Sequence, residues 1–267
     1  MTNPPARYDA AGTSGIINIK TKKTVTAGYN GSATIGFTQG RYPKTNEGFN
    51  FNYREGKINV FSNLSHNYRK GFGTLLFNRN ILNGTNSAVE KIFDQRTDRI
   101  AAGNSYAAKM GADFFASKKT TLGIVVSGTS SPSEAENLNV TRISNAANQL
   151  EKITKASVNN GNDWKSFSTN LNVRYQFDAK GKEITSDLDF LTYGSTNRQF
   201  MVNSFYDALG QESDNADTLT GYLPQDIAVY SGRVDYIHPL KKGARFEAGI
   251  KSSVVRTDNN AGYDSIQ

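Results

Sequence analysis

The sequence predicts an all-β fold, in which antiparallel strands form part of a transmembrane β-barrel. Apolar and polar residues alternate in segment after segment along almost the whole chain, and tight turns and long polar connections join these segments in turn. Successive side chains of a strand point to opposite faces, so this alternation indicates a sheet with one apolar and one polar face. Such strands, with short turns at one end and long loops at the other, are typical of outer-membrane barrels.

Residues 29–38 show the alternation most clearly. Tyr29, Ile35 and Phe37 share one face with small residues, while Thr34 and Thr38 share the other with Asn and Ser. Nine barrel strands are expected between residues 27 and 257. The further clear ones lie at 49–53, 58–68, 106–116, 166–177, 184–190, 227–237 and 246–254. Two are less regular, because Phe61 in one, and Ile227 and Val229 in the other, fall on the polar face.

Four tight turns are predicted, at 54–57, 117–120, 178–182 and 239–243, where Gly and polar residues favour turn conformations. They recur about every sixty residues, which is room for two strands and one long loop. The segments 70–103, 131–162 and roughly 200–224 are rich in Asn, Ser, Thr and Asp and are expected to be these long loops. They are either spacers or an external surface that captures a ligand.

Alternation alone does not say what the apolar face touches, since a soluble β-sandwich gives the same pattern. Three features favour lipid. Strands are longer than the five or six residues usual in globular sheets, and small residues such as Ala108 and Ala112 on the apolar face would leave gaps in a packed core. Aromatic residues also gather on that face beside the tight turns, as at a membrane interface. They are Tyr53, Phe114, Tyr175, Phe177, Tyr236 and Phe246.

Composition narrows the function classes. A hydrophobic fraction of 37% in 267 residues fits a barrel with a wet lumen. The net charge is +7, but Lys and Arg are scattered, which argues against nucleic-acid binding. Absence of Cys excludes disulfides and thiolate metal sites. No apolar run reaches the length of a membrane-spanning helix.

The two ends of the sequence favour a piece of a larger barrel. No signal peptide follows Met1, as an exported protein would need. Nine strands is an odd number, and Gln267 follows what reads as a polar tail and not a closing strand.

The first seventy residues resemble TonB-dependent outer-membrane receptors. The pair Arg7-Tyr8 precedes a turn from Gly12 to Gly15 and a Gly-Ile-Ile-Asn-Ile strand that is followed by Lys22-Lys23. This is similar to the end of the plug domain in that family, which leads directly into the first barrel strand. The run from Gly40 to Lys70 is similar to a branch of the family found in Bacteroidetes-type bacteria.

The resemblance implies a domain division and a function. Residues 1–26 would be the C-terminal end of a plug domain, and residues 27–267 about nine strands of a presumed twenty-two-stranded barrel. The family takes up scarce ligands such as siderophores, cobalamin or glycans through the outer membrane of Gram-negative bacteria. Its partners would be membrane lipid, an unknown small-molecule ligand and the TonB energy-coupling protein, reached through a region outside this sequence. A passive porin or structural barrel, and a soluble secreted glycan-binding β-sandwich, remain as alternatives.

No residue is assigned to catalysis, to a cofactor or to a metal, and the protein is not expected to be an enzyme. The two histidines, His66 and His238, lie on different strands without Cys or paired carboxylates at ligand spacing. A barrel lipase would need a Ser–His pair with an orienting partner, and none is distinguished. The acidic residues Glu212, Asp214 and Asp217 lack the ordered spacing of a calcium loop. Trp164 is expected to be an interfacial anchor, with a ligand-stacking role as the alternative.

Overall fold

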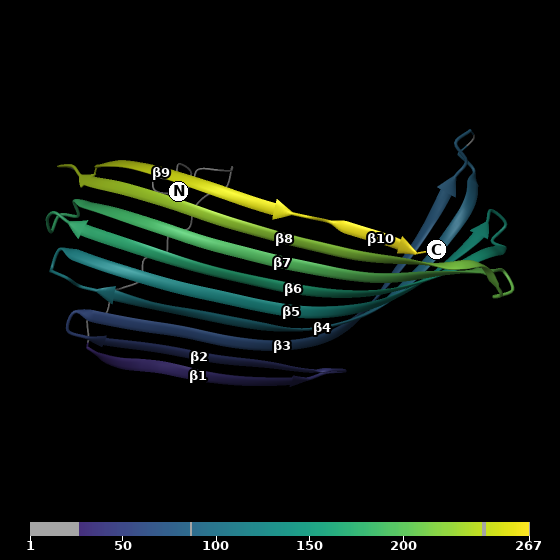
Figure 1. Cartoon of the computed structure of the whole chain (residues 1–267), viewed down its shortest axis with the longest axis horizontal. Coiled ribbons are helices and arrows are strands. Elements are labelled where there is room, and N and C mark those ends of the chain that lie inside the picture. Colours follow the sequence, from purple (N-terminus) through teal and green to yellow (C-terminus); the bar gives the residue numbers. More distant parts are fainter. Residues whose placement is uncertain (1–26, 86, 242–243, 267) are drawn as a thin grey trace.

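The structure, a computed structural model, describes residues 27–85, 87–241 and 244–266. They form one layer of antiparallel strands that curves into a trough (Figure 1). The strands are β1 (Gly28–Gln39), β2 (Pro43–Glu55), β3 (Ile58–Leu82), β4 (Val89–Phe114), β5 (Thr120–Asn145), β6 (Leu150–Gln176), β7 (Glu183–Asp207), β8 (Glu212–Pro239), β9 (Arg245–Asn259) and β10 (Gly262–Ile266).

The topology is an up-and-down meander in which each strand from β1 to β8 pairs with the next. β9 and β10 both pair with β8, and their register on it is continuous, from Asn259 opposite Gln225 to Gly262 opposite Tyr222. They therefore occupy one strand position, which confirms the nine expected positions. The expected polar tail is wrong in part, because residues 262–266 are paired strand. The described sheet is open, with β1 at one edge and β9 and β10 at the other.

The expected long loops are the main error of the sequence analysis. β3 and β4 stay paired as far as Leu82 and Val89, and β5 and β6 pair from the tight-turn end out to Ser144 and Leu150. In place of the three expected long loops, the connections are only 83–88, 146–149 and 208–211. Both faces of these extensions carry polar residues, so the alternation that marks a strand disappears there. The tight turns at 54–57, 117–120 and 178–182 are confirmed, at the left of Figure 1, while the fourth, 239–243, includes residues outside the described part of the chain.

The register gives the tilt of the strands. Val60, Leu171 and Gly232 lie on one line of paired residues across the sheet. Val60 is two residues from the tight-turn end of β3, Leu171 five from that of β6 and Gly232 seven from that of β8. The line thus advances about one residue per strand. With a rise of about 3.3 Å and a strand spacing of about 4.8 Å, this corresponds to a tilt of about 35°. Closed membrane barrels have tilts in this range.

The convex face of the sheet carries a wide apolar band. Along β6 the side chains of Phe167, Leu171 and Tyr175 all point to this face and are 44, 47 and 37% exposed. Tyr175 and Phe167 are eight residues apart, which at this tilt is about 22 Å along the barrel axis. That height matches the apolar belt of about 25 Å on outer-membrane barrels.

Aromatic clusters border the band on both sides. The lower one, beside the tight turns, joins Tyr175, Phe177 and Tyr236, with Tyr175 and Phe177 edge to face at 4.9 Å. The upper one joins Phe167, Phe190 and Tyr230. The predicted aromatic ring beside the tight turns is confirmed, while the upper cluster was not foreseen.

Between the two clusters, the register places no Asp, Glu, Lys or Arg on the convex face of β3 to β9. The apolar band, its two aromatic borders and the lack of charged residues between them together require a lipid environment for the convex face. A soluble sandwich would cover that face with a second sheet, and the described strands form a single sheet. The charge-free band on a single described sheet argues against the sandwich alternative.

The concave face is polar, as a water-filled lumen requires. Phe61 is an aromatic exception on this polar face. Its ring lies over the bare backbone of its pairing partner Gly111, where a Cβ would come within 2.3 Å of the ring. Aromatic cover of a strand glycine is a known stabilising arrangement. The predicted plug segment, residues 1–26, lies outside the described residues.

Candidate functional site: a hollow on the concave face

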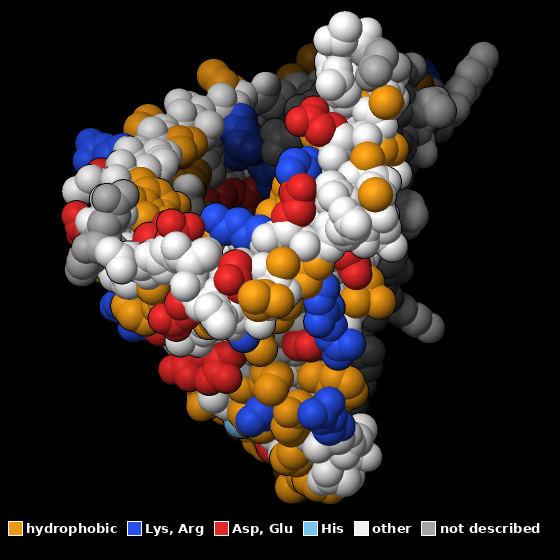
Figure 2. Space-filling view, turned by 90° about the vertical axis from the view of Figure 1, so that its right-hand side faces the viewer, with side chains coloured by type: hydrophobic (Ala, Val, Ile, Leu, Met, Phe, Trp, Pro, Cys, Tyr) orange, Lys and Arg blue, Asp and Glu red, His pale blue; other side chains and the backbone are white. Residues whose placement is uncertain are grey.

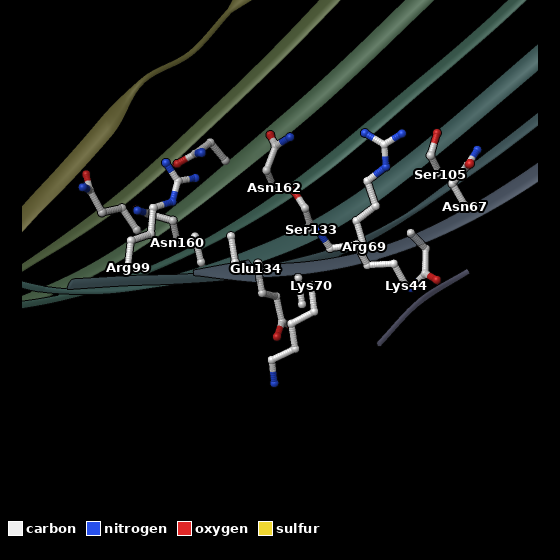
Figure 3. A pocket seen from close by; sticks show the side chains of 18 of the residues that line it. Lys44, Asn67, Arg69, Lys70, Arg99, Ser105, Ser133, Glu134, Asn160 and Asn162 are labelled. Atoms are coloured by element: carbon white, nitrogen blue, oxygen red, sulfur yellow. The ribbon is translucent and has the colours of Figure 1, made fainter. Parts of the chain in front are cut away.

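A hollow of about 1190 Å³ lies on the concave face, where the strands leave the level of the apolar band. Side chains from β2 to β8 and β10 line it, and Figure 3 shows most of the labelled ones rising from one side of the sheet. The polar groups facing the hollow are mainly amides and hydroxyls, with three cations among them. They are Lys44, Asn67, Arg69, Arg99, Ser105, Ser133, Asn160, Asn162, Asn197, Gln199 and Tyr263.

The sheet itself brings these residues together. In each strand the residues facing the hollow are every second one, because side chains alternate. Pairing then places Ser133 beside Gly103 on β4 and beside Asn162 on β6, and Asn162 beside Asn197 on β7. A Cβ at Gly103 would lie 2.8 Å from the Ser133 Cβ, so this position must stay bare for the two strands to approach. The hollow is thus lined by short polar side chains between longer cationic ones.

The side chains of the three cations, Lys44, Arg69 and Arg99, make no ion pair or hydrogen bond with any other residue that the structure describes. Two arginines elsewhere in the lumen are ion-paired: Arg174 contacts Glu183, and Arg233 contacts Asp187 and Asp235. An unpaired guanidinium keeps its five N–H donors available in a fixed fork that matches a carboxylate or phosphate. The hollow therefore offers positive charge that the described protein does not neutralise.

Among the described residues that line the hollow, no carboxylate faces these cations from the same side of the sheet. Glu134 borders the hollow, but in Figure 3 it and Lys70 point away from Arg69, Asn160 and Asn162, to the convex side. The acidic side chains of the lumen gather elsewhere, near the tight turns of β7 and β8, as Glu183, Asp187, Asp189 and Asp235. Asp235 is 6% exposed and ion-paired to Arg233 at 3.0 Å. Seen from the end with the long extensions, charged side chains of both signs border the hollowed side (Figure 2).

The hairpin extensions above the hollow carry charged pairs of their own. The Arg96 guanidinium donates two hydrogen bonds to Asp98, and Thr74 donates a third from the facing strand. The hydrogen bonds from Arg96, which have the largest effect, and from Thr74 lower the pKa of Asp98 below its ordinary value. Asp98 therefore stays ionised at neutral pH, and its bond from Thr74 joins β3 to β4 in the extension.

Trp164 is not the lipid anchor that the sequence predicted. It lies on the concave face, between Ser131 and Ser195, and packs edge to face against Tyr193 at 5.6 Å. Ile227 pairs with Tyr193 on the same face. Of the two apolar residues that broke the pattern of 227–237, Ile227 thus lies beside Tyr193 in the lumen, and Val229 pairs there with Leu191.

Both histidines contact other side chains of the described part of the chain. His66 Nδ1 lies 2.8 Å from the Glu47 carboxylate, His66 Nε2 lies 3.0 Å from the Asn104 side chain, and its ring stacks on Tyr106 at 4.6 Å. Glu47 and His66 are on the convex face near the top of the apolar band, so their pairing satisfies two polar groups that lipid would leave unpaired. Near the tight turns, His238 contacts the hydroxyl of Tyr236.

Within the described residues no group of three or more His, Cys, Asp and Glu side chains could hold a metal ion. Asp214 of the acidic segment instead contacts Lys152 at 3.3 Å. Gly71-Phe72-Gly73 lies within the extended strand β3 and not in a phosphate-binding turn. In the same described part, no helix is long and apolar enough to cross a membrane.

The charge-free convex band with its two aromatic borders indicates that lipid surrounds this face of the sheet. Residues 175–267 match the Outer membrane protein beta-barrel family. The match covers the end of β6 and all of β7 to β10. The match places the protein in the bacterial outer membrane as a β-barrel protein; the matched family, whose model covers the last third of the chain, is typically non-enzymatic. Comparison with curated proteins and with solved structures gave no match.

Proposed function

We propose that this protein takes part in uptake through the outer membrane, as a receptor that captures a negatively charged ligand in the concave hollow. The observation that carries the proposal is the group of three unpaired cations, Lys44, Arg69 and Arg99, in a hollow lined with amides. Amide and hydroxyl groups bind the hydroxyls of a polar ligand, and guanidinium groups bind its carboxylate, sulfate or phosphate. The hairpin extensions of β3 to β8 supply the outer walls of the entrance.

The resemblance of residues 4–23 and 40–70 to TonB-dependent receptors supports energy coupling of this uptake. In that scheme a plug fills the barrel, and an inner-membrane partner drives ligand passage. A siderophore, a glycan with acidic groups or another anionic nutrient complex would suit the hollow. A neutral ligand would leave the three cations unused.

Binding is tested first, with the full-length protein purified in detergent. Titration calorimetry compares an acidic oligosaccharide, oligogalacturonate, with a neutral one of equal length. We expect measurable heat for the acidic probe, and a loss of about tenfold or more in affinity when Arg69 and Arg99 are both changed to Gln. The matched control changes Arg96 and Arg198, which are already ion-paired outside the hollow, and should leave affinity within about threefold. Equal binding of both probes would refute the preference for anions.

Energy coupling is tested separately in a planar lipid bilayer. A plugged receptor should show no steady conductance, whereas a passive porin would show stepwise open channels without any energy source. Open channels would refute coupled uptake and leave the ligand preference intact, because the titration does not depend on transport.

A further inference from the structure

A second cationic cluster lies on the convex face, away from the hollow. It joins the β1–β2 turn to the outer surface of β3 and consists of Arg41, Tyr42, Lys70 and Phe72. The Arg41 guanidinium lies 4.4 Å from the centre of the Phe72 ring, and the Lys70 ammonium lies 4.7 Å from that of Tyr42. The two rings meet edge to face at 6.2 Å. We call these four residues the shoulder cluster.

The shoulder cluster belongs to the lipid side of the sheet. Lys70 and Phe72 alternate in β3 with the lumenal residues Arg69 and Gly71, and they continue the convex row of Leu64. In Figure 3 Lys70 points to the side opposite Arg69. The ring contacts then place Arg41 and Tyr42 on this side as well.

The height of the cluster corresponds to the outer membrane surface. Lys70 is twelve residues from the tight-turn end of β3, which at a tilt of about 35° is about 32 Å. The apolar belt of such barrels is about 25 Å tall. Tight turns face the periplasm and long hairpins face outward, so the two cations lie just above the hydrocarbon of the outer leaflet. The first hairpin ends at this level, at residues 40–42, while the hairpins from β3 onward continue.

The cations of the cluster keep their hydrogen-bonding edges available. A cation over an aromatic face is held by the ring electrons, and neither Arg41 nor Lys70 forms an ion pair within the described part of the chain. The nearest acidic side chain on this face along the pairing line is Glu134, two strands away from Lys70 through Ala102. Two strand spacings are about 9.6 Å, and the side chains of Lys70 and Glu134 form no ion pair in this structure. Phe72 itself is 56% exposed.

We propose that the shoulder cluster binds the phosphate headgroup of an outer-leaflet lipid, with Arg41 and Lys70 on the phosphate oxygens and Phe72 against the lipid. Clusters of Lys and Arg at a membrane surface are attracted to anionic lipid headgroups. Guanidinium–phosphate contacts add directional hydrogen bonds to this attraction. An exposed aromatic ring at the same level anchors the protein at the interface. The site is separate from the concave hollow and does not depend on the proposed uptake.

The test uses the full-length protein, purified in detergent and delipidated, and native mass spectrometry with three probes: bisphosphorylated lipid A, lipid A with its phosphates removed, and inorganic phosphate. We expect the bisphosphorylated lipid to bind at least about tenfold more tightly than the dephosphorylated one. Changing Arg41 and Lys70 together to Gln should abolish this difference, and Phe72→Leu should reduce it. Stronger retention of inorganic phosphate than of lipid A would overturn the assignment to lipid.

A matched control changes Lys118 and Lys180, two cations in the tight turns at the other end of the barrel, to Gln. It removes the same charge and should leave the preference for phosphorylated lipid within about twofold. A loss equal to that of the Arg41 and Lys70 variant would show general charge attraction and overturn a defined site. Heat-dependent gel mobility confirms that each variant is folded, and a variant with Arg41→Lys and Lys70→Arg, which keeps both charges, should retain binding.

Discussion

Arginine placed along the convex face of β6 should reveal the membrane band as a depth profile of stability. Leu171 is four residues from each aromatic border, Tyr175 and Phe167, and therefore lies at the middle of the band. Arg on the lipid face costs about 2–4 kcal/mol at the midplane and about 0–1 kcal/mol near the interfaces. We therefore expect Leu171→Arg to lower the free energy of unfolding by about 2–4 kcal/mol, and Phe167→Arg to carry a much smaller charge-transfer cost.

The neighbouring residue supplies the control at nearly the same depth. Asn170 points into the lumen and donates a hydrogen bond of 2.7 Å to Asp189. An Arg there faces water and a carboxylate, so Asn170→Arg should change stability by less than about 1 kcal/mol. The assay is equilibrium unfolding by urea of the full-length protein in lipid vesicles. Equal costs at 170 and 171 would refute the assignment of the two faces, and an unfolding cost that did not depend on depth would refute the membrane band.

Three further outcomes are expected. Gly111→Ala should cost about 1–3 kcal/mol, because its Cβ would strike the Phe61 ring; a double-mutant cycle with Phe61→Ala in the same urea assay should show partial rescue, and strict additivity would contradict the contact. The backbone N–H groups of Lys182 and Lys180 donate to Asp178 and lower its pKa below the ordinary 3.8; its contribution to the turn is therefore present above that value and lost as pH falls through the lowered pKa. Asp178→Ala should remove this acid-dependent part of stability, measured between pH 6 and pH 3, and an unchanged pH profile would argue against the turn. Replacing residues 74–98 by a two-residue Asn-Gly turn should leave the barrel folded by heat-dependent gel mobility, because this hairpin is paired only with itself and with the β5 extension above the band; failure to fold would show that the extension is needed for assembly.

The sequence was sufficient for the parts of the fold where two different solvents meet the two faces of a strand. Lipid outside and water inside impose alternation, so residues such as Tyr175 and Leu171 could be assigned to the convex face and Asn170 to the concave face without coordinates. The tight turns followed from Gly and polar residues, as at Asp178. The lower aromatic border could be predicted because aromatic residues of the apolar face stand next to the tight turns in the sequence.

Alternation failed above the membrane for the same physical reason. There water meets both faces of β3 to β8, so polar residues occur on both faces and the extended hairpins look like loops in sequence. The pairing of Thr74 with Asp98 became visible only in the structure. An unstructured loop of about thirty residues is itself uncommon in a compact fold, and this length was a signal against the loop prediction.

The contacts that define the two candidate binding sites were decided by the tertiary structure alone. Whether Arg69 and Arg99 face one hollow, or Arg41 reaches the Phe72 ring, depends on the register between strands and on the curvature of the sheet. Local sequence carries neither quantity. It determined which residues could face lipid or water, and the pairing of distant strands determined which of them meet.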